Sequence, residues 1–141
     1  MIVALYVETS AVLTWVFGEP AGGHAIEVMN SAPLVVSSTL TMLECERAIL
    51  RAEREHAIAE AQSVTLRRLF RDVLRGWELM EITPEVQRRA AEAFPVEPVR
   101  SLDAIHLSTV LHFLELYDDI SVLSFDSRIL DNVPLLGLAT A

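Results

Sequence analysis

The chain contains no lysine, and all 11 of its basic residues are arginine. This absence excludes mechanisms that need a lysine, such as P-loop phosphate binding and Schiff-base chemistry. Its five glycines do not form a glycine-rich phosphate loop. The single cysteine, Cys45, cannot form an internal disulfide, so nothing indicates an oxidising compartment, and we expect a cytoplasmic protein.

Long apolar runs and a general excess of positive charge are also missing. The first apolar run, residues 2–7, is too short for a membrane span of about 20 residues and has no basic leader, so we expect a soluble protein without membrane contact. The net charge of −9 disfavours non-specific nucleic-acid binding through a general basic surface. The arginines cluster on a few helical stretches, so any nucleic acid must be bound locally.

What the chain does have is enough apolar sequence for one compact domain spanning residues 1–141, with 52% hydrophobic residues. Predicted strands cover residues 2–7, 34–37, 77–82, 120–124 and 135–138. Predicted helices cover about 9–17, 23–30, 39–54, 57–75, 83–95, 102–117 and 126–131. Strands separated by helices favour an α/β fold, a three-layer α/β/α sandwich around a central parallel sheet of four to five strands. The consecutive helices 39–54 and 57–75 interrupt the alternation and are predicted to project as a hairpin.

Glu8 stands where the first apolar strand ends, directly before the hydroxyl residues Thr9 and Ser10. In open α/β sheets, reactive groups collect beyond the carboxyl ends of such strands. A charge that ends a buried strand therefore indicates a functional role, although interaction with the dipole of the following helix is the simpler alternative.

Asp103 is the strongest single candidate for a functional acid. It shares a helical stripe with Leu107, Val110 and Leu114, at spacings of 4, 7 and 11, so its carboxylate lies on an apolar face. Burying an acid there is costly unless it is paired or bound to a metal ion. The alternative is that Asp103 only complements the helix dipole in the first turn.

Two further acids have simple structural explanations when considered alone. Asp126 follows the fourth predicted strand and could be an ordinary helix N-cap. Glu44 is followed by Arg47 and Arg51 on the same helix face, which favours a solvated stripe with a weak ion pair of about 0.2–0.5 kcal/mol. Only convergence with Glu8 and Asp103 would make these two acids functional.

Together, the four acids predict a site for a hard divalent cation. Mg²⁺ and Mn²⁺ prefer oxygen ligands, and such ions promote the hydrolysis of phosphodiester bonds. Zinc is disfavoured because His106 and His112 are six residues apart, which is the wrong spacing for two ligands on one helix face. A serine hydrolase triad is disfavoured because no Gly-x-Ser-x-Gly motif occurs.

Four segments of the chain carry a family resemblance: Tyr6 to Ala11, Ser38 to Glu44, Arg100 to Leu107 and Leu123 to Arg128. In these motifs, and in their order, the sequence resembles PIN-domain ribonucleases, and in size and order it is similar to VapC-type toxins of bacterial toxin–antitoxin modules. The resemblance implies a Mg²⁺- or Mn²⁺-dependent endoribonuclease with Ser10 and Ser124 as supporting polar groups. It also implies a homodimer that is inhibited by a small antitoxin whose tail reaches into the acidic cleft.

One position departs from the family pattern. The first acid of the family is usually aspartate, and here it is Glu8, which is one methylene longer. A displacement of about 1 Å in a positioned group can cost on the order of 10²-fold in rate. Glu8 is therefore a tolerated variant, a sign of weakened catalysis, or an introduced substitution, and the sequence does not choose among these interpretations.

Two hypotheses arise from these residues. In the first, the protein is a ribonuclease toxin in which Glu8, Asp103 and Asp126 hold the metal ion and Glu44 completes the ring or orients the attacking water. Arg47 or Arg51 would contact RNA phosphates or the antitoxin, and single-stranded or loop RNA would be the preferred substrate. In the second, the protein is a catalytically impaired PIN-fold protein that binds RNA or an antitoxin.

Overall fold

The structure is a computed structural model that describes residues 3–141. The strands are β1 (Val3–Val7), β2 (Val35–Ser38), β3 (Glu78–Met80), β4 (Asp119–Leu123) and β5 (Ala139–Thr140). The helices are α1 (Thr9–Val16), α2 (Gly22–Ser31), α3 (Thr39–Arg54), α4 (Glu60–Leu74), α5 (Pro84–Ala90), α6 (Ser101–Leu114), α7 (Ser127–Asn132) and a short 3₁₀ helix, η1 (Pro134–Leu136). Within residues 3–141, none of the helices combines the length and the apolar character that crossing a membrane requires.

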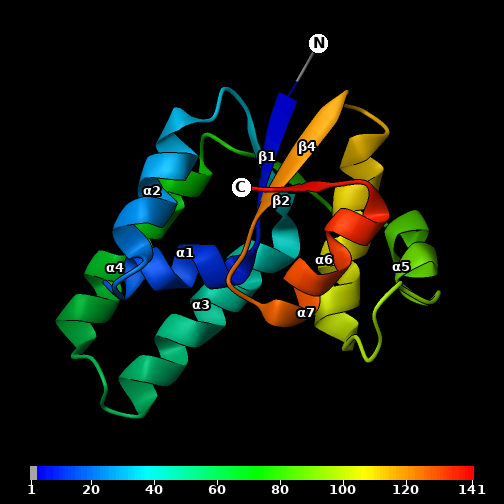
Figure 1. Ribbon diagram of the computed structural model, residues 1–141. Coiled ribbons are helices and arrows are strands. Elements are labelled where there is room, and N and C mark those ends of the chain that lie inside the picture. Colours follow the sequence, from blue (N-terminus) through cyan, green and yellow to red (C-terminus); the bar gives the residue numbers. More distant parts are fainter. Residues whose placement is uncertain (1–2) are drawn as a thin grey trace.

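The five strands form one parallel sheet in the order β3-β2-β1-β4-β5. The pairing of β1 with β4 is the longest and runs from Val3 opposite Asp119 to Val7 opposite Leu123. The strands run away from the N-terminus, which is at the top of Figure 1, so their carboxyl ends face the lower part of the molecule, where α3 and α7 lie. The predicted parallel sheet of four to five strands is confirmed.

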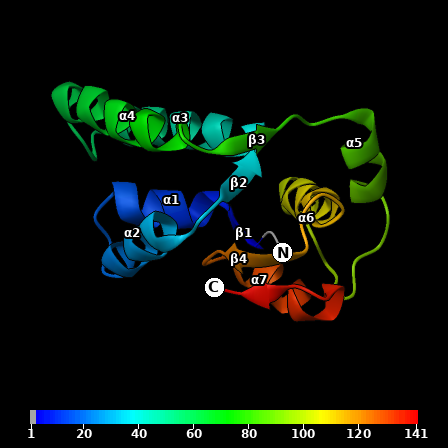
Figure 2. The ribbon, with the colours of Figure 1, turned by 90° about the horizontal axis from the view of Figure 1, so that it is seen from above.

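The alternation of side chains along β1 divides the core into two layers. Ala4 and Tyr6 pack with residues of α6 and α7, whereas Leu5 and Val7 pack with residues of α1 to α4. Figure 2 shows the corresponding arrangement, with α1 to α4 on one side of β1 and β2 and with α5 and α6 on the other. Because side chains of a strand alternate between the two faces, a strand covered on both faces must be apolar throughout, as β1 is.

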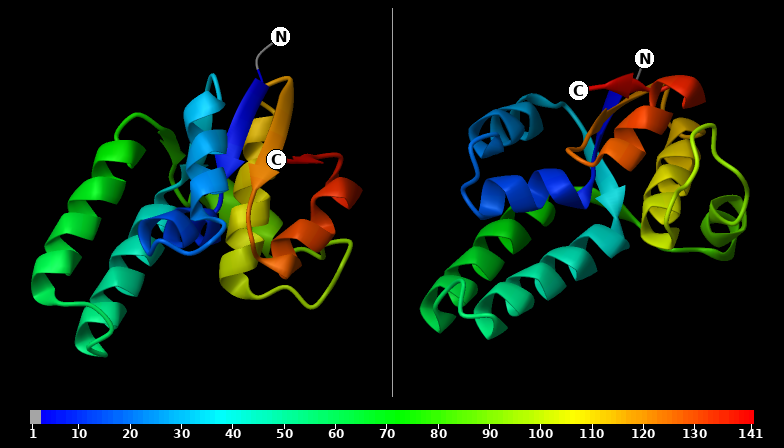
Figure 3. Two further views of the ribbon diagram at one scale, coloured as in Figure 1. Left: turned by 60° about the vertical axis from the view of Figure 1, so that its left-hand side comes forward. Right: turned by 60° about the horizontal axis from the view of Figure 1, so that its bottom comes forward.

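Helices α3 and α4 lie side by side and extend beyond the sheet, as both views of Figure 3 show. Ion pairs from Arg67 and Arg71 of α4 to Glu46 of α3 join the two helices. The predicted helical hairpin is therefore confirmed, and it places the first turns of α3 next to the carboxyl end of β1.

Two predicted elements were wrong in their position. The last strand was expected at residues 135–138, but Pro134 begins a 3₁₀ helix there, and β5 comes only after Gly137, whose φ of 77° turns the chain. The helix predicted for residues 83–95 ends at Ala90. Pro95 disfavours helical geometry at Phe94, which is instead buried in the core with the Arg89 guanidinium 4.3 Å from its ring.

Candidate active site

The four acids that the sequence singles out line one pocket of about 500 Å³ at the carboxyl ends of β1 and β4. They come from four separate segments: the end of β1, the first half of α3, the first turn of α6 and the start of α7. The full lining is Glu8, Thr9, Ser10, Leu13, Glu44, Arg100, Ser101, Leu102, Asp103 and Asp126. Because parallel strands end at the same edge of the sheet, residues distant in sequence come together there.

Glu8 is almost fully buried, with 5% of its surface exposed, and its carboxylate accepts three hydrogen bonds. The Ser10 hydroxyl donates to Oε1 at 2.5 Å and the Ser124 hydroxyl donates to the same oxygen at 2.6 Å. The Ser10 backbone N–H donates to Oε2 at 3.1 Å, so Glu8 also caps α1. Glu8 therefore interacts with the start of α1, as the structural alternative proposed, and it also lines the acidic pocket. Ser10 and Ser124 lie beside the acid as the resemblance implies.

Glu44 does not form the solvated ion pair with Arg47 that its sequence context favoured. Its Oε1 accepts a hydrogen bond from the Thr9 hydroxyl at 2.7 Å and lies 2.6 Å from Nε2 of His106. Burial acts to raise the pKa of the Glu44 carboxyl, but the hydrogen bond and charge of His106, together with the Thr9 hydroxyl, hold that pKa below its ordinary value. Thr9 of α1 and His106 of α6 therefore hold the Glu44 side chain at the pocket.

Asp103 is buried, with 7% of its surface exposed, in the first turn of α6. Its Oδ2 has no hydrogen-bond partner among residues 3–141, and the nearest cation is the Arg100 guanidinium, whose Nε is 3.6 Å away. Burying a polar atom without a partner is unfavourable by about 1–3 kcal/mol. A buried carboxylate oxygen that lines a pocket, has one distant cation and lacks a hydrogen bond within the described part of the chain is suited to a ligand that the protein itself does not supply.

Asp126 is both a helix N-cap and part of the lining of the acidic pocket. Its Oδ1 accepts a hydrogen bond from the Arg128 N–H at 2.9 Å, which makes it the N-cap of α7. The same side chain lines the acidic pocket. The loop before it is fixed by Ser124, whose hydroxyl oxygen accepts from the Asp126 N–H at 3.0 Å.

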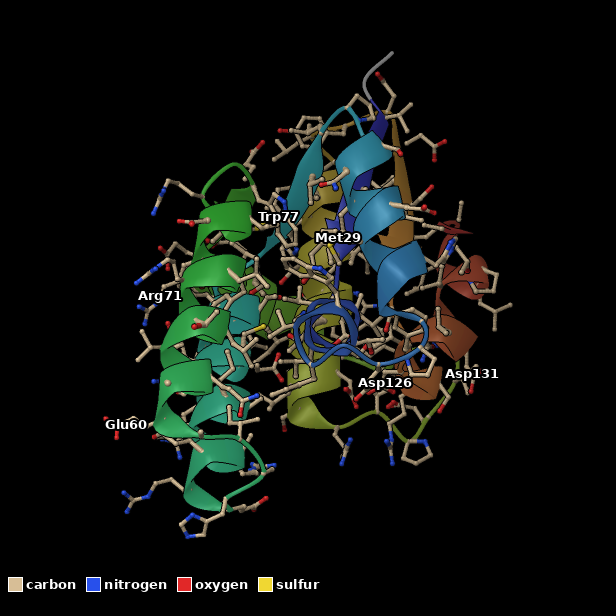
Figure 4. The ribbon with its side chains drawn as sticks, turned by 90° about the vertical axis from the view of Figure 1, so that its left-hand side faces the viewer. Met29, Glu60, Arg71, Trp77, Asp126 and Asp131 are labelled. Carbon is tan, nitrogen blue, oxygen red and sulfur yellow. The ribbon has the colours of Figure 1, made fainter. Side chains whose placement is uncertain are left out.

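Neither of the two arginines proposed as RNA or antitoxin contacts lines the pocket with the acids. Arg47 lines a separate surface pocket with Glu46, Arg67 and Arg71 between α3 and α4, and Arg51 is exposed one turn further along α3. In Figure 4, Arg71 of this group and Asp126 lie on opposite sides of the view. The pocket with the acids contains a different arginine, Arg100, with 68% of its side chain exposed.

Three residues of this site were not predicted from the sequence: Thr9, Arg100 and His106. His106 was considered only as a zinc ligand. A histidine three residues after Asp103 on the same helix does not by itself indicate a functional site. The available signal was its place within the Arg100-to-Leu107 motif. Its contacts depend on β1 and α3, which no local pattern reveals.

The donor set fits a hard divalent cation in its chemistry. All four acids offer carboxylate oxygens, which Mg²⁺ and Mn²⁺ prefer, and Oδ2 of Asp103 is buried without a hydrogen bond from the described residues. In residues 3–141, however, no three His, Cys, Asp or Glu side chains are arranged as a ready ligand set. The acids line one cavity, in which neighbouring hydroxyl and imidazole groups hold Glu8 and Glu44.

Fold and site together define a class: an α/β protein with a parallel sheet whose acids gather in a pocket at the carboxyl ends of the strands. The family model of the PIN domain matches residues 5–135. This match covers most of the chain, which therefore belongs to the PIN domain family.

Comparisons with individual proteins agree with this assignment. The chain is 24% identical over 107 residues to Ribonuclease VapC45 and to Ribonuclease VapC49, both of Mycobacterium tuberculosis, and the match covers 76% of this chain and 74% of each relative. A toxin–antitoxin complex from Klebsiella pneumoniae aligns with a TM-score of 0.65 at 18% identity, over 97% of this chain and 96% of the other. VapBC2 from Rickettsia felis, bound to a promoter DNA fragment, aligns with a TM-score of 0.67 at 9% identity, over 98% and 97%. At such identities, these structures support the fold alone.

Proposed function

We propose that this protein is a metal-dependent endoribonuclease of the toxin class, neutralised by a cognate antitoxin. The observation that carries the proposal is the convergence of Glu8, Glu44, Asp103 and Asp126 on one pocket, with a buried oxygen of Asp103 that has no hydrogen-bond partner among the described residues. Four carboxylates in one pocket repel one another, and a divalent cation offsets that repulsion. Membership of the PIN domain family and the ribonuclease relatives support the same activity.

In this proposal, Glu8, Asp103 and Asp126 hold Mg²⁺ or Mn²⁺ directly or through water, and Glu44 completes the ring or orients the attacking water. A bound ion would neutralise charge on the phosphodiester and activate a water for in-line attack. The protein contributes the fixed positions of the oxygens. Ser10 and Ser124 hold the Glu8 carboxylate through hydrogen bonds of 2.5 and 2.6 Å, so this ligand does not need to be ordered when the ion binds.

The glutamate at position 8 is accommodated by its neighbours. Its longer side chain turns back so that both oxygens meet donors from Ser10 and one meets Ser124. This arrangement keeps the carboxylate at the pocket and favours a working site over the catalytically impaired binding protein. The variant Glu8→Asp tests the point, because it shortens the side chain by one methylene and restores the usual acid of the family.

RNA is the proposed substrate, and Arg100 is the best-placed residue to contact a phosphate beside the metal site. It lines the acidic pocket and is largely exposed, whereas Arg47 and Arg51 lie on the α3–α4 hairpin and do not line this pocket. A phosphate entering the pocket could replace the 3.6 Å contact of Arg100 with Asp103. Arg47 and Arg51 are then better suited to the antitoxin than to the scissile phosphate.

The antitoxin partner is supported by the structural neighbours, one of which is a toxin–antitoxin complex. VapC20 of Mycobacterium tuberculosis is a Sarcin-Ricin loop cleaving toxin and aligns with a TM-score of 0.62 at 16% identity, over 90% of this chain and 93% of the other. The single-stranded or loop RNA expected from the sequence is the first substrate to test. Analytical ultracentrifugation tests the homodimer that the family resemblance implies.

The deciding experiment measures RNA cleavage during titration with Mg²⁺ and Mn²⁺. A pool of structured RNAs is incubated with the wild-type protein, with Asp103→Asn and with Glu8→Asp, and each reaction is repeated with a chelator. We expect cleavage by the wild type that needs the metal and disappears in Asp103→Asn. Equal inactivity of wild type and Asp103→Asn under all metals would contradict the proposal, unless Glu8→Asp alone gains activity, which would identify an attenuated site.

A further inference from the structure

His106 is buried at the centre of the site but does not line the pocket. It is 2% exposed, and its ring contacts residues from three other elements. Nδ1 lies 2.8 Å from the Tyr6 hydroxyl of β1, and Nε2 lies 2.6 Å from Glu44 Oε1 of α3 and 3.2 Å from the Thr9 hydroxyl of α1. A buried histidine with polar partners on both ring nitrogens has a fixed orientation.

Contact with the Glu44 carboxylate determines that Nε2 of His106 carries a hydrogen. A carboxylate oxygen only accepts hydrogen bonds, so across the 2.6 Å contact Nε2–H donates to Oε1 of Glu44. The fully buried Tyr6 hydroxyl is both a donor and an acceptor, and it hydrogen-bonds Nδ1 on the other side of the ring. Tyr6 and Glu44 therefore hold the imidazole between them.

The hydrogen bond from His106 fixes one half of the Glu44 carboxylate. His106 and the Thr9 hydroxyl both donate to Oε1, at 2.6 and 2.7 Å. No donor to Oε2 is found among residues 3–141, and the side chain lines the acidic pocket. One oxygen is therefore held by the protein while the other remains for a ligand.

We propose that His106 is a positioning residue for Glu44, with Tyr6 fixing the ring so that Nε2–H directs the Glu44 carboxylate toward the ion that the acidic pocket would bind. This inference rests on the proposed function, because it assigns Glu44 a part in binding that ion. It adds two buried residues, Tyr6 and His106, that do not line the acidic pocket. Groups that orient metal ligands typically contribute about 10- to 100-fold to metal affinity.

The test measures Mn²⁺ binding to the metal-free protein by electron paramagnetic resonance and by calorimetry, without RNA. We expect His106→Leu to weaken Mn²⁺ binding by about 10- to 100-fold, and His106→Gln, which keeps an N–H donor, to recover most of that loss. Tyr6→Phe removes the hydrogen-bond partner of Nδ1 and should give a smaller loss in the same direction. Thermal unfolding of each variant checks that the fold is retained.

His112 provides a matched control on the same helix. Its Nδ1 lies 2.8 Å from the Ser108 carbonyl oxygen one turn earlier, and it lines a different pocket, with Arg88 and Glu115. His112→Gln should leave Mn²⁺ affinity unchanged. Losses of equal size in the His106 and His112 variants would mean that any histidine substitution on α6 disturbs the site, and would overturn the proposal.

A double-mutant cycle separates positioning of Glu44 from general support of the structure. If His106 acts through Glu44, His106→Gln and Tyr6→Phe should have no further effect on Mn²⁺ affinity in a Glu44→Gln background. Undiminished effects in that background would overturn the inference, even if His106→Leu fails to fold. In RNA cleavage, the His106 variants should lower kcat while KM for RNA stays within about threefold, because the ion and not the RNA is misplaced.

The outcomes also distinguish this inference from the proposed function. If the wild type binds Mn²⁺ and Asp103→Asn does not, the metal site stands, and normal binding by His106→Leu then contradicts only the role of His106. If neither the wild type nor Asp103→Asn binds Mn²⁺, the proposed metal site itself fails and the inference fails with it.

Discussion

The two ends of the same parallel sheet have opposite chemistry. At the carboxyl ends of the strands, four acids, three hydroxyl residues and Arg100 line a pocket of about 500 Å³. At the amino ends, a pocket of about 440 Å³ is lined by Val3, Ala4, Leu5, His24, Glu27, Val28, Ser31, Ala32, Pro33, Ser121 and Ala141. The strands between the two pockets are largely apolar, so the polarity of each end depends on the residues that flank the strands.

The difference arises from the direction of the helices. At the carboxyl end of a strand the next helix begins, and its first backbone N–H groups need acceptors. Glu8 accepts from Ser10 N–H, and Asp126 accepts from Arg128 N–H, so both acids are held where helices begin. At the other end, helices finish with carbonyl groups, which disfavour anions. A parallel α/β sheet therefore offers positions for acids at the edge where its helices begin.

The contrast between the two ends predicts the largest effect for Asp103→Asn, because under the proposed function this buried acid is a metal ligand. Loss of a metal ligand should reduce metal-dependent cleavage by more than about 100-fold. Removing a group that only orients a ligand costs up to about 100-fold, and removing the ligand itself should cost more. The metal-free variant should be more stable by roughly 1 kcal/mol, since one of four mutually repelling carboxylates is gone. Cleavage assays and thermal unfolding measure both effects, and a destabilised variant would show that Asp103 has a structural role.

At the opposite end of the sheet, Leu5→Ala should change stability without changing the site. Leu5 is 5% exposed in β1 and packs with the α1–α4 side of the core, so its truncation should lower the free energy of unfolding by about 2–5 kcal/mol. Urea unfolding measures this loss, and Leu135→Ala at an exposed leucine is the control. Mn²⁺ affinity of the folded protein should be unchanged. An altered affinity would mean that the two ends of the sheet are coupled.

Arg100→Ala tests whether the acidic end of the sheet also holds the phosphate. Loss of one charged phosphate contact should raise KM for RNA about tenfold and make RNA binding less dependent on salt. Arg47→Ala, on the α3–α4 hairpin, is the matched control and should leave KM unchanged. A larger effect of Arg47→Ala would place the RNA across α3 instead of at the pocket.

The smallest expected effect is a change in how much stability the protein loses at low pH when the Glu44 carboxyl is replaced. Because the pKa of Glu44 is lowered in the folded protein, the stability it contributes is complete above the pKa of the unfolded chain, which is about 4.3. That contribution is lost as the pH falls through the lower folded pKa. Unfolding of the metal-free protein at pH 7 and at pH 3 should therefore show a smaller acid-induced loss in Glu44→Gln than in the wild type. Identical losses would mean that His106 does not stabilise the carboxylate.

Local sequence patterns were sufficient for most of the fold. Continuous apolar strands alternating with helices predicted the parallel sheet and its helical layers, and the adjacent long helices predicted the hairpin. The errors came where a few residues decide the backbone, as at Pro134 and Gly137 before β5 and at Phe94 and Pro95 after α5. At these positions a turn or burial in the core decided the backbone conformation, against the prediction from the local sequence.

The sequence by itself determined that acids stand after apolar strands and at helix starts, because these positions depend on local order along the chain. Only the tertiary structure decided that Glu44 bonds to His106 and not to Arg47, and that Arg100 lies at the acidic pocket while Arg47 does not. The physical reason is that these contacts join β1, α3 and α6. Their geometry is set by the packing of helices on the sheet, which no local periodicity encodes.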